Sequence, residues 1–170
     1  MKLRVQDILN VALFSALTAI GALISVPLPF SHVPITLQTM FTYMAGALLG
    51  SYLGALSQLI YVLMGVMGLP IFAKGSAGIS VLLGPTGGYL AGFIPGAFVI
   101  GKLAEIKKNP SFRWLLICMT AGTAVIYVLG VLQLMNWVRI GMKEAIVVGV
   151  LPFSWRRVKD VSGCLHEHPN

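Results

Sequence analysis

The sequence predicts an all-α, polytopic membrane protein, in which a bundle of helices crosses the bilayer. Of its 170 residues, 57% are hydrophobic and only 10% are charged, whereas soluble domains carry about 25% charged residues. The mean hydropathy is +0.88. The net charge of +7 raises the question of nucleic-acid binding, but the basic residues stand in short clusters between long apolar runs. Membrane topology places them in this way.

Four apolar runs account for the predicted helices, since a crossing helix needs about 20 apolar residues. The first run, residues 8–26, ends at the prolines that follow it. The second, residues 36–72, would form a helix about 55 Å long, which far exceeds the thickness of a bilayer. We therefore expect a hairpin that turns near residues 49–52. Residues 85–103 and 112–135 supply the fourth and fifth spans.

The basic residues favour a cytoplasmic amino terminus. With five crossings, the inner side holds Lys2, Arg4, Lys102, Lys107, Lys108 and Arg113, and the outer side holds Lys74, Arg139 and Lys143. A sixth crossing by residues 144–155 would bring Arg156, Arg157 and Lys159 inside, which gives nine basic residues against three. Without that crossing the split is six against six. The charges alone leave five or six crossings open.

Small residues recur every four positions in three of the spans, and this spacing places them near one helix face. The fourth span carries Gly84, Gly88, Gly92 and Gly96, the hairpin carries Gly46, Gly50 and Gly54, and the first span carries Ala12 and Ala16. Such stripes let helices pack closely in lipid. A nucleotide-binding loop would need a lysine after the glycines or a strand before them, and neither is present. We interpret the glycines as helix-packing residues.

Polar and aromatic side chains gather where the outer ends of the spans are expected. Such groups are costly at membrane depth and are therefore candidates for a site. The predicted substrate-binding residues are Thr36, Gln38, Phe72, Lys74, Thr86, Gly87, Gly88, Tyr89, Asn136 and Trp137. Together they favour an outward-facing pocket for a small anion with an apolar body. Each of these residues has a structural alternative to ligand binding. Trp137 is as well explained as an interface anchor, Gln38 as the partner in a helix–helix hydrogen bond and Lys74 as a contact to lipid headgroups.

Catalysis has little support in the sequence. It contains no Gly-x-Ser-x-Gly, no His-Glu-x-x-His and no pair of intramembrane carboxylates, which are patterns of hydrolases and metal enzymes. We expect no enzymatic activity, no catalytic residue and no metal site. A membrane enzyme stays open as an alternative, and its most plausible residues are His32 and Ser76. The two cysteines form no CxxC pair.

Three motifs, PLPFSHVPITLQT, GLPIFAKGSAG and LLGPTGGYLAGF, together resemble the BioY family, the substrate-binding S components of energy-coupling-factor (ECF) biotin transporters. The resemblance covers residues 8–153. It implies a six-helix protein in the plasma membrane of a prokaryote that binds biotin from outside, as a transported ligand and with no covalently bound cofactor. It also implies docking on a transmembrane coupling subunit, driven by two ATPases, through Ala12 and Ala16.

The resemblance breaks after residue 153. In the family, the motif GVLPF (residues 149–153) precedes a Leu-Pro-Gly-Asp-x-x-Lys pattern and a sixth helix, but here Arg157 and Asp160 stand at the Asp and Lys positions. We therefore expect a BioY-like transmembrane domain over residues 1–153 and a divergent polar tail over residues 154–170, with the sixth helix missing or aberrant. The resemblance makes residues 144–153 an outer segment, and a changed reading frame is our hypothesis for the tail. An S component for another vitamin and a truncated, non-binding homologue are the alternatives.

Overall fold

The structure, a computed structural model, describes residues 4–26, 34–107 and 110–138. Its long helices are α1 (Val5–Leu23), α2 (Gln38–Val66), α4 (Gly87–Glu105) and α5 (Phe112–Val138). All four are long and apolar enough to cross a membrane. The shorter elements are β1 (Ser25–Val26), β2 (Ile35–Thr36), the 3-10 turn η1 (Ala73–Gly75) and α3 (Ile79–Leu83). The fold is therefore an all-α membrane bundle, as the composition predicts, with one small antiparallel β1–β2 ribbon.

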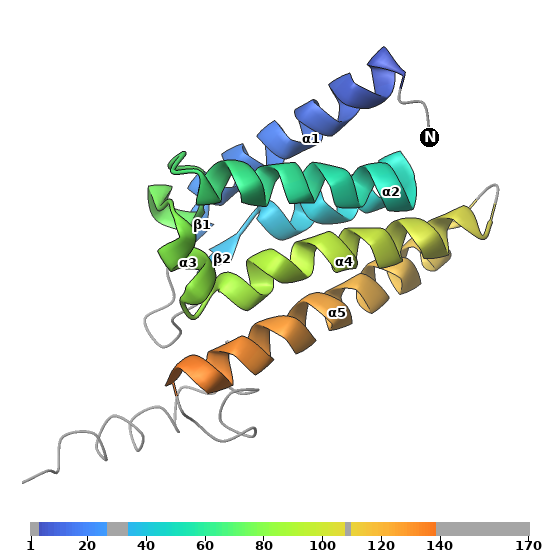
Figure 1. Ribbon diagram of the computed structural model, residues 1–170. Coiled ribbons are helices and arrows are strands. Elements are labelled where there is room, and N and C mark those ends of the chain that lie inside the picture. The colour runs from blue at the N-terminus through green and yellow to red at the C-terminus, as the bar shows by residue number, and fades with distance from the viewer. Residues whose placement is uncertain (1–3, 27–33, 108–109, 139–170) are drawn as a thin grey trace, which may run out of the picture.

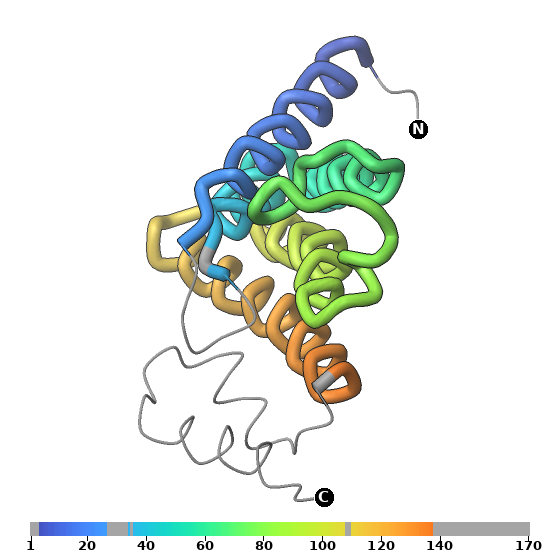
Figure 2. Tube along the Cα trace, turned by 90° about the vertical axis from the view of Figure 1, so that its left-hand side faces the viewer, coloured from blue at the N-terminus to red at the C-terminus, as the bar shows by residue number. Residues whose placement is uncertain are grey.

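The helices pack in the order α1, α2, α4, α5, each against the next (Figure 1). At one end of the bundle, which we call the loop end, lie β1, β2, η1, α3 and the last turn of α5. At the opposite end, the turn end, lie the start of α1 and the connection between α4 and α5. Figure 2 faces the loop end and shows the segment between α2 and α4 lying across it.

Helix α2 doubles back on itself at Gly50, which divides it into a first arm (residues 38–49) and a second arm (residues 51–66). Gly50 has φ +82° and ψ −175°, a conformation that is essentially restricted to glycine. Thr42 Oγ1 lies 3.1 Å from Gln58 Oε1, although a straight helix would separate these residues by about 24 Å. The predicted hairpin and the position of its turn are thus confirmed.

The end of α4 holds this turn in place. The Ser51 amide donates a 2.7 Å hydrogen bond to Glu105 Oε1, and the Ser51 hydroxyl donates to the same oxygen at 3.0 Å. A carboxylate suits this position because the first amides of a helix lack partners and carry the positive end of its dipole. Gly101 lets the backbones meet, since an added Cβ would lie 2.4 Å from the carbonyl carbon of Gly50.

Glycines bring α4 against α5 in the same manner. An added Cβ would lie 2.4 Å from Leu129 O at Gly88, 3.0 Å from Ile126 Cα at Gly92 and 2.6 Å from Ile126 Cγ1 at Gly96. The stripe differs from the sequence expectation at one position. Gly84 ends α3 instead of lying in α4, and a Cβ there would meet only its own preceding turn, at 3.3 Å.

The hairpin glycines do not form one stripe, because the chain reverses between them. An added Cβ at Gly46 would lie 2.6 Å from Ala97 O of α4, whereas one at Gly54 would lie 2.9 Å from Ala45 O of the first arm. Gly50 itself forms the turn. The three glycines predicted to share a face therefore serve a helix–helix contact, a contact between the arms and a backbone reversal.

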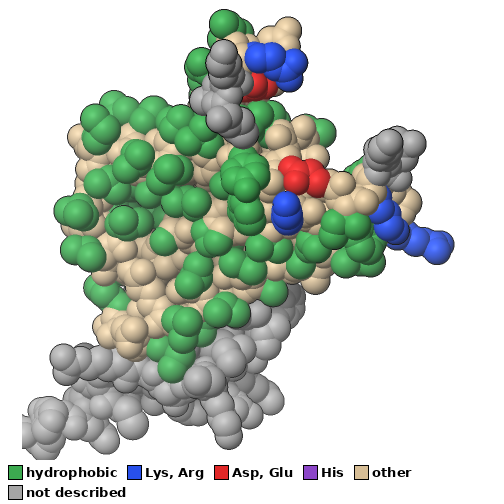
Figure 3. All heavy atoms as spheres, turned by 45° about the vertical axis from the view of Figure 1, so that its right-hand side comes forward, with side chains coloured by type: hydrophobic (Ala, Val, Ile, Leu, Met, Phe, Trp, Pro, Cys, Tyr) green, Lys and Arg blue, Asp and Glu red, His purple; other side chains and the backbone are tan. Residues whose placement is uncertain are grey.

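Charged side chains separate the two ends of the bundle. Among the described residues, Arg4, Lys102, Lys107 and Arg113 belong to the turn end, and Lys74 is the one basic residue of the loop end. Lys107 Nζ lies 4.1 Å from the centre of the Trp114 ring, in a cation–π contact. Figure 3 shows the charged side chains of this face gathered toward one side, beside a broad surface of apolar groups.

Several predicted element boundaries differ from the structure by two or more residues. Helix α1 ends at Leu23, because Ser25 and Val26 pair with β2. Helix α2 ends at Val66, well before residue 72. Helix α4 begins at Gly87, two residues after Pro85. The carbonyl oxygens of Leu82 and Gly84 accept hydrogen bonds from Gln133 Nε2 of α5, at 2.7 and 2.8 Å, so the chain can leave helical geometry here with these carbonyls satisfied.

Candidate functional site

Two features of the loop end contain four of the ten predicted substrate-binding residues. The first, which we call the Gln38 clasp, consists of Thr36, Gln38, Tyr61 and the carbonyl of Ile71. Thr36 donates to Gln38 Oε1 at 2.9 Å, and Gln38 Nε2 donates to the Tyr61 hydroxyl. The Tyr61 hydroxyl in turn donates to Ile71 O at 3.1 Å. The clasp ties β2, both arms of α2 and the following loop into one hydrogen-bonded unit.

Phe72 lies beside the clasp and is fully buried, although it belongs to a loop. Its ring meets the Tyr61 ring edge to face, with centroids 5.7 Å apart. It also occupies the space that a side chain at Gly65 would fill. Phe72 and Gln38 are thus part of the wall of the loop end, where the hydrogen bonds of the clasp fix the orientation of the Gln38 amide.

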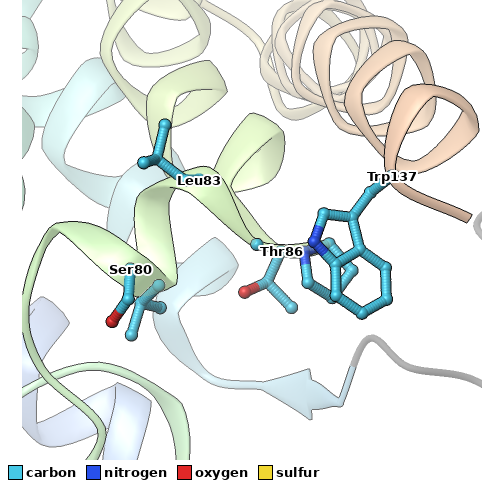
Figure 4. A pocket seen from close by; sticks show the side chains of 7 residues that line it. Ser80, Leu83, Thr86 and Trp137 are labelled. Atoms are coloured by element: carbon cyan, nitrogen blue, oxygen red, sulfur yellow. The ribbon is translucent and has the colours of Figure 1, made fainter.

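The second feature is an open groove of about 440 Å³ between the α3–α4 connection and the end of α5. Its lining residues are Ser80, Val81, Leu83, Gly84, Pro85, Thr86 and Trp137, and we call it the groove. Figure 4 shows Trp137 reaching from α5 toward the connection that carries Thr86. The lining is mostly apolar, with the hydroxyls of Ser80 and Thr86 at its edge. Apolar walls with a few polar groups are typical of small-molecule sites.

The remaining predicted substrate-binding residues divide into buried and exposed positions. Gly87, Gly88 and Tyr89 are buried, whereas Lys74 and Asn136 are exposed at the loop end. The Tyr89 ring packs over Gly130 and meets Tyr127 edge to face, with centroids 5.9 Å apart. Tyr89 therefore lies in the α4–α5 contact and does not line the groove, unlike Thr86. Tyr61, Phe72 and Tyr89 nevertheless join one buried cluster behind the loop end.

Ala12 and Ala16 lie on the outer face of α1, where both are exposed. The opposite face of the same helix is buried and carries Phe14, Ser15 and Thr18. The two alanines thus present a smooth strip that no described part of the chain covers. A surface of this kind admits close approach by another membrane helix.

Two residues of this region were missed by the sequence reasoning. Tyr61 is the centre of the clasp, and Gln133 fixes the backbone on one side of the groove. The available signal was a polar atom inside an apolar run, which is itself a reason to look for a partner in lipid. This signal is weak because the apolar run does not indicate which residue the polar atom will bond to.

Some predictions fall outside the described residues. They concern His32, the segment 144–155, the altered positions Arg157 and Asp160, and the tail over residues 154–170. Within the ranges that the structure does describe, no group of three or more His, Cys, Asp or Glu side chains could hold a metal ion. The charged group of the loop end in these ranges is the exposed Lys74 amine.

Comparison with known protein families shows which family this chain belongs to. The model of the BioY family matches residues 1–160. The chain belongs to the BioY family. Over 150 residues it is 48% identical to a Thermotoga maritima protein named biotin transporter BioY, a match that covers 88% of this chain and 86% of the relative. A Pyrococcus horikoshii protein named probable biotin transporter BioY is 44% identical to this chain, in a match that covers 89% of this chain and 86% of the relative.

A solved structure supports the BioY assignment of the fold. The crystal structure of the S-component for biotin from an ECF-type ABC transporter superimposes with a TM-score of 0.80. It is 28% identical in sequence, and the match covers 88% of this chain and 82% of the other. The recognition made from the three motifs is therefore confirmed, as is the prediction of a multi-pass helical membrane protein.

Proposed function

We propose that this BioY-family chain is the substrate-capture subunit of a biotin importer, which binds biotin at the loop end from the outer side of the membrane. The observation that carries the proposal is the likeness to proteins named biotin transporters over nearly nine tenths of the chain. The groove supplies apolar walls for a thioether ring and an aliphatic tail. Biotin is the transported ligand in this proposal, and no covalent cofactor takes part.

Lys74 is the proposed partner of the biotin carboxylate. It is exposed, it belongs to the loop end, and it has the left-handed backbone conformation of φ +60° and ψ 24°, which is uncommon for a residue with a side chain. The ureido head of biotin would be bound by amide and hydroxyl groups, for which Gln38, Thr36, Thr86 and Asn136 are the candidates. Trp137 would cover the apolar part of the ligand.

Isothermal titration of purified protein with biotin tests this proposal. We expect saturable binding by the wild-type protein, and Lys74→Ala should weaken it about tenfold, which is about 1.4 kcal/mol. The matched control is Lys102→Ala, which removes the same charge from the turn end and should leave the affinity unchanged. Biotin methyl ester, which lacks the carboxylate charge, tests the Lys74 contact directly. The wild-type protein should prefer the free acid over the ester, and Lys74→Ala should lose this preference.

Absence of binding by intact wild-type protein would contradict the proposal and favour a truncated, non-binding homologue. A competition screen against other vitamins distinguishes the remaining alternative, an S component with a different ligand. Equal loss of affinity in Lys74→Ala and Lys102→Ala would attribute the loss to the net charge of the protein instead of to a contact between Lys74 and the biotin carboxylate.

We further propose that the chain delivers biotin together with a transmembrane coupling subunit and two ATPase subunits, and that Ala12 and Ala16 contact the coupling subunit. Support comes from the exposure of both alanines and from the neighbour named as part of an ECF-type transporter. The variant Ala16→Trp should abolish co-purification with the coupling subunit while titration with biotin stays unchanged. Loss of both properties would show a folding defect and count against a docking role.

The amino terminus is proposed to face the cytoplasm, with the loop end outside. The support is the distribution of basic residues, since the described ones other than Lys74 belong to the turn end, and cytoplasmic ends carry an excess of Lys and Arg. A cysteine introduced at Gly75 should react in intact cells with a membrane-impermeant maleimide. One introduced at Lys107 should react only after the membrane is permeabilised, and the reverse pattern would invert the proposed topology.

A further inference from the structure

A buried polar ladder runs between α1 and the two arms of α2. Its rungs are side-chain hydrogen bonds, and its members are Ser15, Thr18, Gln38, Thr42, Ser57, Gln58 and Tyr61. Thr18, Thr42, Ser57, Gln58 and Tyr61 are 0% exposed. Polar groups at this depth cost free energy unless they have partners, and in this ladder every one has them.

Gln58 is the junction of the ladder. Its Oε1 lies 3.1 Å from Thr42 Oγ1 of the first arm, and its Nε2 donates to Thr18 Oγ1 of α1 at 3.2 Å. The same nitrogen lies 3.3 Å from the hydroxyl of Ser57. Both ends of the amide are therefore satisfied in one orientation, and a single side chain joins three helical segments.

The ladder continues from Gln58 to the Gln38 clasp by two routes. Thr42 Oγ1 lies 3.0 Å from the main-chain oxygen of Gln38. On the second arm, Tyr61 follows Gln58 by three residues, hence on the same helix face, and it accepts the hydrogen bond from the Gln38 amide. The Thr42–Gln58 rung thus sets the spacing of the arms one helical turn below the rung that orients Gln38.

Helix α1 is tied to the same junction. Ser15 donates to the main-chain oxygen of Ser57 at 2.7 Å, next to the Gln58 rung. A displacement of α1 along α2 would have to break this bond and the Thr18–Gln58 bond together. A fully satisfied polar network of this kind specifies one arrangement of its helices more sharply than apolar packing does.

We propose that Gln58 is a positioning residue for ligand binding, which fixes Gln38 in its binding orientation by holding α1 and both arms of α2 at one spacing. The inference rests on the proposed function, because it assigns Gln58 a role in the affinity for biotin. Gln58 does not contact the ligand, and its effect passes through Thr42 and Tyr61 to Gln38.

A double-mutant cycle tests the proposal, with the dissociation constant for biotin measured on folded protein. Gln58→Met keeps the length of the side chain and removes its hydrogen bonds, and we expect it to weaken binding about tenfold. In the Gln38→Ala background the same substitution should change the affinity by less than about twofold, since residues that act through one another are not additive. A merely structural role would give the same fold-change in both backgrounds.

Thr18→Val provides a milder test should Gln58→Met fail to fold, because it removes the link between α1 and Gln58 together with the local bond from Thr18 to the main-chain oxygen of Phe14. We expect about a threefold loss of affinity from one lost interhelical hydrogen bond, again absent in the Gln38→Ala background. Its matched control is Thr120→Val, which removes a hydroxyl that bonds to the main-chain oxygen of Leu116 on the exposed side of α5. This control should bind as the wild type does.

The outcomes separate this proposal from the proposed function. Wild-type protein that does not bind biotin contradicts the function itself. Wild-type binding with no loss in Gln38→Ala, or with equal losses from Gln58→Met or Thr18→Val in both backgrounds, overturns the positioning role and leaves the function standing.

Discussion

The two halves of the bundle are held together by different chemistry. Between α1 and the arms of α2, side-chain hydroxyl and amide groups bond across the contact, with Gln58 joining three helical segments and Gly21 of α1 allowing a close approach to Phe41. Between α4 and α5, glycines let the backbones meet, and an added Cβ at Gly88 would lie 2.4 Å from a carbonyl oxygen of α5. Lipid tails are as apolar as the side chains, so burial of apolar groups does not drive helix association in a membrane. Close backbone packing and interhelical hydrogen bonds can both take its place. The glycine contact tolerates no added atom, whereas the polar contact depends on groups that can be removed without changing shape.

The largest effect is expected from filling the glycine contact. Gly88→Ala would place a methyl group against the backbone of α5, and backbone cannot yield as a flexible side chain does. We expect a loss of about 3 kcal/mol of stability, at the upper end for overpacking, measured by unfolding in mixed detergent and SDS micelles. Gly84→Ala is the matched control, because its Cβ would meet only its own turn, at 3.3 Å. Equal losses in the two variants would mean that the stripe does not set the α4–α5 distance.

An intermediate effect is expected where α4 meets the hairpin turn. Glu105→Ala removes the acceptor of the Ser51 amide and hydroxyl. A helix cap of this kind contributes about 1 kcal/mol, so the unfolding midpoint in SDS should fall by a corresponding amount. Glu105→Gln keeps an acceptor oxygen and should recover much of the loss. A Gln variant as unstable as the Ala variant would assign the effect to the charge of the carboxylate at the helix end.

The smallest effect is expected from one rung of the polar ladder. Thr42→Val preserves the shape of the side chain and removes the hydroxyl that lies between Gln38 O and Gln58 Oε1. Interhelical hydrogen bonds in membranes contribute about 0.6 kcal/mol, and the same unfolding assay should report a loss of that size. Thr120→Val, on the exposed side of α5, should be neutral. A loss in Thr42→Val that matches Gly88→Ala would remove the distinction between the two halves.

Sequence reasoning succeeded where the governing geometry is local. A run of 37 uncharged residues is too long for one crossing, so the hairpin and its turn at Gly50 could be foreseen. The four-residue spacing of Gly88, Gly92 and Gly96 likewise follows from helix geometry. Three motifs were enough to identify the family.

It was less successful where the outcome depends on which surfaces meet. Phe72 stands among loop residues, yet its ring fills the notch at Gly65. Pro85 has the chemistry of a helix start, but Gln133 satisfies the preceding carbonyls and the helix begins two residues later. The assignment of Gly46 and Gly54 to one face failed because a reversal between them directs each toward a different neighbour. Such contacts depend on how the chain turns between the two residues, and no local pattern encodes them.

The Ser51–Glu105 contact has a consequence for the order in which the protein is made. The two residues lie 54 positions apart, so the ribosome has synthesised the whole hairpin, η1, α3 and most of α4 before the carboxylate exists. Until then the first amide of the second arm lacks this partner, and the turn is defined by the conformation of Gly50 and by the contacts between the two arms. The hairpin that enters the membrane early is therefore completed late, by the last residue of α4.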